Sequence, residues 1–294
     1  GTDYVGEGAE AITVTDATVS ASALATLLAN GAGPTTGDIT IVASSMTGTE
    51  AEVSLILDDT IDLAAGGLVN QHTVDDSATV TGLAGINITL SGTPTAAQVN
   101  AIATRTTGTV TATLSGTAAQ IVAGLTETVA ATGGHALTVN LADAEVTAAN
   151  LNSISSFTTG NITLDTDAAT AGNQSPAISG SVTDINTVFA DSTITGASAS
   201  ALTVTGGISV SDLNTLATKT TGVITATVSD GDMATLAGIT ETTNALSIAV
   251  TDASISATAL DALATKTTGL VNVSATSTLT GTLAEVTATL GNTA

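Results

Sequence analysis

Residues 201–222 read ALTVTGGISVSDLNTLATKTTG and combine two hydrophobic periods. Apolar and hydroxyl residues alternate at the start of this stretch, as a half-buried strand requires. Ser209 is then followed by leucine four and seven residues later, at Leu213 and Leu216. This spacing places a helix N-cap ahead of one buried stripe. The stretch therefore predicts a strand, then a two-turn helix that terminates at Gly222.

The same pattern recurs along the chain when it is aligned on Thr-Thr-Gly. Five copies end at Gly37, Gly108, Gly160, Gly222 and Gly269. A hydroxyl residue stands in the N-cap position before each copy, at Ser20, Thr95, Thr147, Ser209 and Ser256. A second motif, Gly-Thr/Ser-x-x-x-apolar, lies at 48–53, 116–121, 180–185 and 281–286, with 231–236 as a variant. Its capping-box spacing predicts a second short helix in every repeat.

Strands that alternate with short helices favour a repeat solenoid of parallel β-sheet coils, with helices or turns on the other side. We expect about ten coils stacked at roughly 4.8 Å, which gives a rod of about 50 Å. A pure β-solenoid, or β-helix, is the alternative fold. Residues 1–11 form an N-terminal segment in this interpretation. Residues 12–294 form a single elongated solenoid of about five repeats, each with two strand–helix units, and with insertions at 54–84 and 165–177.

The three basic residues of the chain all occupy one slot of the repeat. Arg105, Lys219 and Lys266 each stand three residues before the glycine of a Thr-Thr-Gly copy. A cation at the end of a helix interacts favourably with the helix dipole and reaches the last free carbonyl groups, worth about 0.3–1 kcal/mol. We interpret the slot as helix-end electrostatics, with a ligand contact as the alternative.

Composition excludes several classes of protein. The chain has 294 residues, a formal net charge of −23 and no cysteine. Disulfides and thiolate chemistry are therefore excluded, and binding to nucleic acid or anionic membranes is disfavoured. Aromatic residues make up only 1% of the chain, so the core must be built from small aliphatic side chains. The sequence contains no apolar run long enough to span a membrane. It also has no initiator methionine and no signal peptide, which indicates a processed chain or part of a longer one.

The search for chemistry yields only calcium candidates. Paired aspartates at Asp165/Asp167 and Asp230/Asp232 offer the oxygen ligands that a hard cation prefers. Capping of a helix N-terminus is the alternative role for Asp230 and Asp232. No catalytic residues, cofactor-binding residues or phosphate loop are found. His135 follows two glycines and is predicted to be a loop residue.

The chain resembles the Thr/Ala/Gly-rich tandem-repeat regions of giant exported bacterial, notably cyanobacterial, cell-surface or matrix proteins. The residues that carry the resemblance are 178-ISGSVTDINTVFADSTITG-196 and 201-ALTVTGGISVSDLNTLATKTTG-222, with residues 245–269 as a second copy of the latter. The resemblance implies a surface or matrix role, in several cases near calcium-binding repeats. It brings no catalytic residues.

These observations predict a non-enzymatic structural protein, an extracellular fibre subunit or cell-surface stalk. Its partner would be a second copy of itself, in a head-to-tail homopolymer. The alternative is an adhesin that recognises a glycan or another surface protein, with calcium as a possible requirement. An enzyme such as a polysaccharide lyase is disfavoured, because such sites need basic or aromatic subsites in a groove. No nucleic acid and no membrane insertion are expected.

Overall fold

The computed structural model describes residues 11–30, 39–59, 80–126, 134–164 and 175–291. The chain divides into two compact units. Unit 1 comprises Gly1–Leu141 and Ser153–Thr163, and unit 2 comprises Ala142–Asn152 and Leu164–Ala294. A single stack that runs from residue 12 to residue 294 stays a prediction.

Each α-helix follows one or two short strands, and we call a helix with its preceding strands a segment, numbered by the helix. In the first five segments the elements are β1 (Ile12–Val14), β2 (Thr18–Ser20), α1 (Ala21–Asn30), β3 (Ile39–Ile41), β4 (Ser45–Thr49), α2 (Glu50–Asp59), β5 (Val80–Thr81), β6 (Asn87–Ser91), α3 (Ala96–Ala103), β7 (Val110–Gly116), α4 (Ala118–Gly124), β8 (Ala136–Leu141), β9 (Glu145–Thr147) and α5 (Ala148–Phe157).

The other five segments repeat this order. They comprise β10 (Ile162–Thr163), β11 (Ala177–Gly180), α6 (Val182–Ala190), β12 (Ile194–Thr195), the 3₁₀ turn η2 (Ala197–Ala199), β13 (Leu202–Ile208), α7 (Val210–Ala217), β14 (Ile224–Val228), α8 (Met233–Leu236), β15 (Ala245–Ala249), β16 (Ser254–Ser256), α9 (Ala257–Ala264), β17 (Val271–Asn272), β18 (Thr278–Thr280) and α10 (Leu283–Gly291). The described residues thus contain the two helices per repeat that the sequence predicts.

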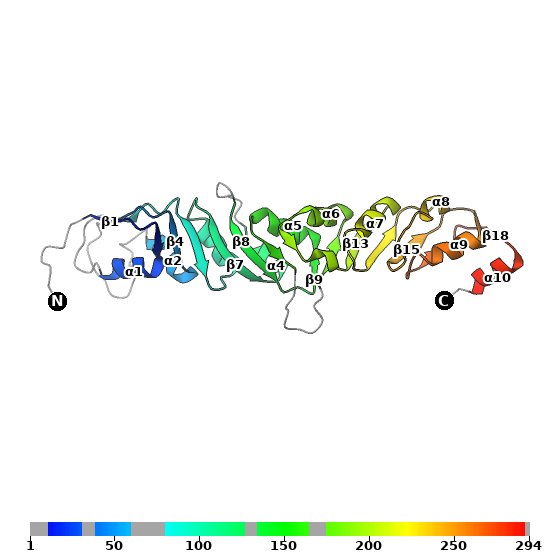
Figure 1. Ribbon diagram of the computed structural model, residues 1–294, viewed down its shortest axis with the longest axis horizontal. Coiled ribbons are helices and arrows are strands. Elements are labelled where there is room, and N and C mark those ends of the chain that lie inside the picture. Colours follow the sequence, from blue (N-terminus) through cyan, green and yellow to red (C-terminus); the bar gives the residue numbers. More distant parts are fainter. Residues whose placement is uncertain (1–10, 31–38, 60–79, 127–133, 165–174, 292–294) are drawn as a thin grey trace. The chain divides into compact units, whose positions relative to one another are not determined.

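Successive segments pair through parallel strands, as expected for strands connected by helices. In unit 1 the strand orders are β1-β3-β5 and β2-β4-β6-β7-β8-β10. In unit 2 they are β9-β11-β13-β14-β15-β17 and β16-β18. The prediction of parallel sheets flanked by short helices is confirmed (Figure 1).

The core lies between the strands and the helices and contains almost only aliphatic side chains. In β7, Val110, Ala112 and Leu114 are buried while the threonines between them are exposed. In α7, the predicted stripe residues Leu213 and Leu216 are fully buried. Burial of one such side chain contributes about 1.5–3 kcal/mol to the free energy of unfolding. A single segment is too thin to bury its own apolar face, so this contribution depends on packing against the neighbouring segments.

The predicted helix caps are confirmed in both motifs. The hydroxyl oxygen of each cap residue accepts a hydrogen bond from a backbone N–H three residues later, at Ser20, Thr49, Thr95, Thr117, Thr147, Ser181, Ser209, Ser256 and Thr282. Complete capping boxes join Thr95 to Gln98 and Thr117 to Gln120. A cap of this kind contributes about 1 kcal/mol to its helix.

One helix extends into a range that was expected to be an insertion. Helix α2 continues to Asp59, because Val53, Ile56 and Leu57 keep the helical spacing and are all buried. Strand β5 begins at Val80, and residues 60–79 lie outside the described residues. In the second expected insertion, β11 begins at Ala177 and residues 165–174 lie outside the described residues.

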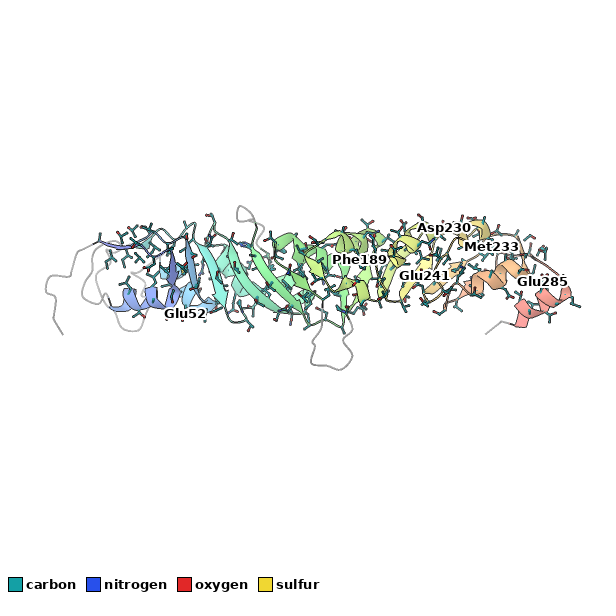
Figure 2. The ribbon with its side chains drawn as sticks, in the orientation of Figure 1. Glu52, Phe189, Asp230, Met233, Glu241 and Glu285 are labelled. Carbon is teal, nitrogen blue, oxygen red and sulfur yellow. The ribbon has the colours of Figure 1, made fainter. Side chains whose placement is uncertain are left out.

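Carboxylate capping boxes give stability that depends on pH. Glu52 and Glu285 are labelled in Figure 2. Their pKa values are lowered from 4.5, mainly because the backbone N–H groups of Thr49 and Thr282 donate to these carboxylates at 2.8 and 2.7 Å. A carboxyl group whose pKa is lower in the folded state than in the unfolded state adds to the free energy of unfolding when the pH is above the unfolded-state pKa. This contribution is lost as the pH falls through the folded-state pKa.

The double variant Glu52→Gln/Glu285→Gln should therefore lose less stability on acidification than the wild type. Glutamine keeps the capping box, as Gln98 and Gln120 do, but carries no titrating group. Urea midpoints measured at about pH 6 and about pH 3 give the comparison. An equal drop in both proteins would show that these boxes do not contribute to the pH dependence.

Candidate functional site

The Thr-Thr-Gly copies join one segment to the segment before it. The described copies are Thr106–Gly108, Thr158–Gly160, Thr220–Gly222 and Thr267–Gly269, and the copy ending at Gly37 lies outside the described residues. Each copy stands after an odd-numbered helix and leads into the next segment. We call the three residues, with the backbone that they contact, the Thr-Thr-Gly clasp.

The first threonine of the clasp binds the backbone of the preceding segment with its hydroxyl group. Thr158 Oγ1 lies 2.8 Å from both the N–H nitrogen and the carbonyl oxygen of Leu137, and it also accepts a hydrogen bond from Gly160 N at 2.9 Å. Thr267 binds Leu246 in the same way. Thr106 and Thr220 donate to the carbonyl oxygens of Ile86 and Ser200. All four of these threonines are buried.

The second threonine binds the preceding segment with its backbone and its side chain. The N–H of Thr159 donates to His135 O at 2.8 Å, and its hydroxyl donates to the same oxygen at 3.1 Å. The other copies pair Thr107 with Ala84, Thr221 with Ser198 and Thr268 with Asn244 in the same manner. Each clasp thus satisfies carbonyl groups that the strand ladder leaves open.

The glycine is required because the two backbones touch. A Cβ atom added at Gly108 would lie 2.2 Å from Ile86 O, and one at Gly160 would lie 2.3 Å from Leu137 O. The sequence interpretation assigned this glycine to helix termination, and that assignment is wrong for the described copies. Helix α3 already ends at Ala103, with Thr104 as a right-handed C-cap.

His135 lies outside the named strands, as a loop residue would, but it forms a parallel bridge with Thr158, is buried and has a structural role. Its Nδ1 accepts a hydrogen bond from Val110 N, the first residue of β7, at 3.2 Å. Asn244 occupies the equivalent position before β15, and its Oδ1 accepts from Ile224 N at 2.9 Å. The acceptor at Nδ1 places the imidazole proton on the other ring nitrogen. Both side chains therefore continue the hydrogen-bond ladder from one segment to the next.

Two of the basic side chains reach across to the preceding helix. Lys219 Nζ donates to Asn186 Oδ1 of α6 at 2.6 Å, and Arg105 Nη1 donates to Ser54 Oγ of α2 at 3.1 Å. Asn186 and Ser54 each stand five residues after the N-cap of their helix. The cations were predicted at the ends of the helices, and Arg105 and Lys219 lie two residues past the last helical residue. Their contacts with a second helix were not part of the helix-dipole interpretation. For Lys266 the matching position in α8 is Ala237, which has no polar side chain.

Asparagine side chains join neighbouring segments at the same position of the odd-numbered helices. Asn214 of α7 donates from Nδ2 to Gly238 O at 2.8 Å and accepts at Oδ1 from Thr240 N at 3.1 Å. Asn100 of α3 accepts from Thr126 N at 3.0 Å. Sequence reasoning missed this column, although its signal is the recurrence of asparagine five residues after the cap at Asn100, Asn152 and Asn214.

Asp230 and Asp232, two of the calcium candidates, serve two different helices. Asp230 Oδ2 accepts from Val210 N at the start of α7 at 2.7 Å, and Asp232 is the N-cap of α8. The backbone N–H of Thr235 donates to the Asp232 carboxylate and lowers its pKa. Asp165 and Asp167 lie outside the described residues. Among the described residues, no three His, Cys, Asp or Glu side chains come together as a possible metal site.

The carboxylate contact of Asp230 is repeated one segment later. Asp252 Oδ2 accepts from Met233 N, the first residue of α8, at 2.7 Å. Both aspartates follow a strand, and both cap the helix of the preceding segment. A charge-assisted hydrogen bond of this type is roughly twice as strong as a neutral one and also suits the positive end of the helix dipole.

A buried serine interrupts the apolar column beneath the clasps. Ser200 occupies the position of Ile86, Leu137 and Leu246, is fully buried, and its hydroxyl has no hydrogen-bond partner among the described atoms. Ser200→Ala should therefore raise the free energy of unfolding by about 1 kcal/mol, because it removes an unsatisfied buried hydroxyl. Urea denaturation measures this, with the exposed Ser198→Ala as a control expected to stay within about 0.5 kcal/mol of wild type. A destabilised Ser200→Ala protein would contradict the assignment.

Large apolar side chains are exposed in segment 10. Leu270, Leu283 and Leu290 are 77%, 85% and 61% exposed. Strands β17 and β18 each pair on one side only within the described residues. Val223, the counterpart of Leu270 in segment 8, is 45% exposed, and Met233, the counterpart of Leu283, is half-buried. Segment 10 therefore presents an apolar face and two open strand edges, which we call the segment-10 face.

No helix within the described ranges has the length and hydropathy to cross a membrane. Searches against protein-family models, curated proteins and solved structures return no match for this chain.

Proposed function

We propose that the chain is a structural solenoid that acts as an extracellular fibre subunit or a cell-surface stalk. Its segments are the coils, and its role is to stack and to associate head to tail with further copies. The Thr-Thr-Gly clasp carries this proposal. It recurs at every described odd-to-even junction and joins two backbones through polar contacts of the same kind each time.

The polar side chains of the described repeat are used for coupling between coils. Clasp hydroxyl groups bind backbone carbonyls, His135 and Asn244 bind strand amides, and Asp230 and Asp252 bind helix amides. A side chain that serves as a fixed backbone partner is a poor nucleophile or general base. This use of the residues favours a structural role over an enzymatic one.

The segment-10 face supports association with another chain. Open parallel strand edges and exposed leucines promote pairing with a further strand. Contacts of this head-to-tail type form rings when the rotation closes and filaments when it does not. The resemblance to repeats of exported bacterial proteins supports an extracellular or cell-surface location.

Negative-stain electron microscopy of the purified chain, with and without a calcium chelator, tests the proposal. We expect extended assemblies of uniform width in both samples, because Asp230 and Asp232 already bind helix amides. Assemblies that vanish on chelation would make calcium a structural component. Single particles at every protein concentration would overturn the proposal of self-association.

A further inference from the structure

A three-residue sequence marks the contact between an aspartate and the helix of the preceding segment. Val228-Ser229-Asp230 and Val250-Thr251-Asp252 each end a strand, and each aspartate accepts a hydrogen bond from the first N–H of that helix. The donors are Val210 of α7 and Met233 of α8. The contact thus recurs at two successive junctions of unit 2.

A third copy at the end of a strand occurs in segment 1, as Val14-Thr15-Asp16, whereas the copies at 182–184 and 210–212 lie within helices α6 and α7. Residues 12–20 read ITVTDATVS, and the corresponding residues of segment 9, 248–256, read IAVTDASIS. Asp16 is exposed, whereas Asp252 is half-buried against its partner. The Asp16 carboxylate has no hydrogen bond to any described residue. Segment 1 therefore offers the acceptor of this contact without a donor.

Segment 10 offers the complementary donor. Leu283 is the first residue of α10, the place that Met233 holds in α8. Its N–H has no hydrogen bond within the part of the chain that the structure describes, and its side chain is 85% exposed. In α7 the residue at this place, Val210, is buried beneath the next segment. The segment-10 face thus lacks the aspartate that inner helices receive.

The alternation of segments shows which segment fits there. The clasp begins each even-numbered segment and binds the odd-numbered one before it, so odd and even segments carry different contacts. Segment 9, an odd segment, covers the even segment 8 through Asp252. A segment that covers the even segment 10 should therefore be odd and carry the Val-Thr-Asp sequence. Segment 1 has both properties.

We propose that segment 1 of a second copy of this chain docks on the segment-10 face, with its Asp16 carboxylate accepting a hydrogen bond from Leu283 N. Strands β1 and β2 then extend the ladders that end at β17 and β18, as those two strands extend β15 and β16 of segment 9. Leu283 and Leu290 become covered. This docking rests on the proposed function, because it specifies the contact through which the copies associate.

Sedimentation velocity over a range of protein concentrations tests the docking with two independent sets of variants. Leu283→Pro removes the N–H donor, and proline suits the first position of a helix. Leu283→Ala shortens the same side chain but keeps the N–H, so it is the matched control. Asp16→Ala removes the acceptor at the other end, with the exposed Glu241→Ala as its control. Circular dichroism melting curves check that each variant folds.

We expect Leu283→Pro to associate about tenfold more weakly than Leu283→Ala, and Asp16→Ala about tenfold more weakly than Glu241→Ala, as for loss of a hydrogen bond to a charged group. Equal association within both pairs, with a wild type that still assembles, would overturn the docking and leave the proposed function standing. A wild type that stays monomeric would overturn both.

Discussion

Thr158→Val is expected to lower the free energy of unfolding by about 3 kcal/mol, although the two side chains have nearly the same shape. The hydroxyl of Thr158 binds the N–H and the carbonyl of Leu137 and the N–H of Gly160. Valine leaves these groups buried without a partner, and each unsatisfied group costs about 1–3 kcal/mol. Urea denaturation of the whole chain measures the effect.

The matched control is Thr159→Val in the same clasp. Thr159 keeps its backbone hydrogen bond to His135 O in this variant and loses only the longer bond from its hydroxyl. We expect a loss of about 0.5–1 kcal/mol. Equal losses for Thr158→Val and Thr159→Val would mean that the buried hydroxyl is not the main contact of the clasp.

Gly108→Ala should also lower the free energy of unfolding by about 3 kcal/mol, because the new methyl group cannot fit between the two segments. The nearest atom would be Ile86 O, a backbone atom, at 2.2 Å. Gly85→Ala is the control from the same segment junction, since its nearest neighbour would be Thr107 Oγ1 at 3.7 Å. Alanine at Gly85 should be neutral or stabilise the chain by up to about 1 kcal/mol.

Thermal and urea unfolding of the two glycine variants give the comparison. A Gly108→Ala protein as stable as Gly85→Ala would show that the segments do not approach each other as closely as the clasp geometry requires. The same substitution at Gly160, Gly222 or Gly269 should reproduce the loss, since a Cβ atom added at each of them would lie 2.2–2.3 Å from a backbone oxygen.

Local features of this fold could be predicted from the sequence because their causes are local. The caps at Ser209 and Thr95 act on N–H groups three residues away, so residue spacing is sufficient to find them. The buried stripe of α7 follows from the positions of Leu213 and Leu216 in the same way. Parallel pairing follows from the alternation of strands and helices.

The clasp could not be predicted in this way, because its partners lie about twenty residues away on another segment. Thr158 and Gly160 act on Leu137, and no spacing within the Thr-Thr-Gly sequence reveals that contact. The glycine suggested a helix terminus because glycine commonly has that role. The clasp glycine recurs although its φ angle is not positive. Close approach of another backbone is therefore the reason that glycine is needed there.

The interpretation of the cations shows the same limit. Lys219 was predicted at the end of α7 and lies two residues past it, but its partner Asn186 belongs to another helix. Asp230 had two interpretations from sequence, and its bond to Val210 N corresponds to helix capping, although the capped helix is not its own. The structure decides such cases because they depend on which segment lies beside which.

The polar columns also explain how a chain of near-identical repeats can keep its register. Apolar packing alone would tolerate a shift by one repeat, since the core residues recur. Some contacts use different residues at different junctions: Lys219 with Asn186 stands where Arg105 contacts Ser54, and His135 with Val110 stands where Asn244 contacts Ile224. A shifted pairing would leave these polar groups without partners, at a cost of about 1–3 kcal/mol each when buried.

Native-state hydrogen exchange of the clasp amides tests most directly whether the Thr-Thr-Gly sequence joins the segments. The N–H groups of Gly108, Gly160, Gly222 and Gly269 each donate to the buried threonine of their own clasp. We predict that they exchange as slowly as the amides of the central strands β7 and β14, because a clasp opens only when two segments separate. Exchange as fast as that of exposed turns would contradict the clasp as the joint between segments.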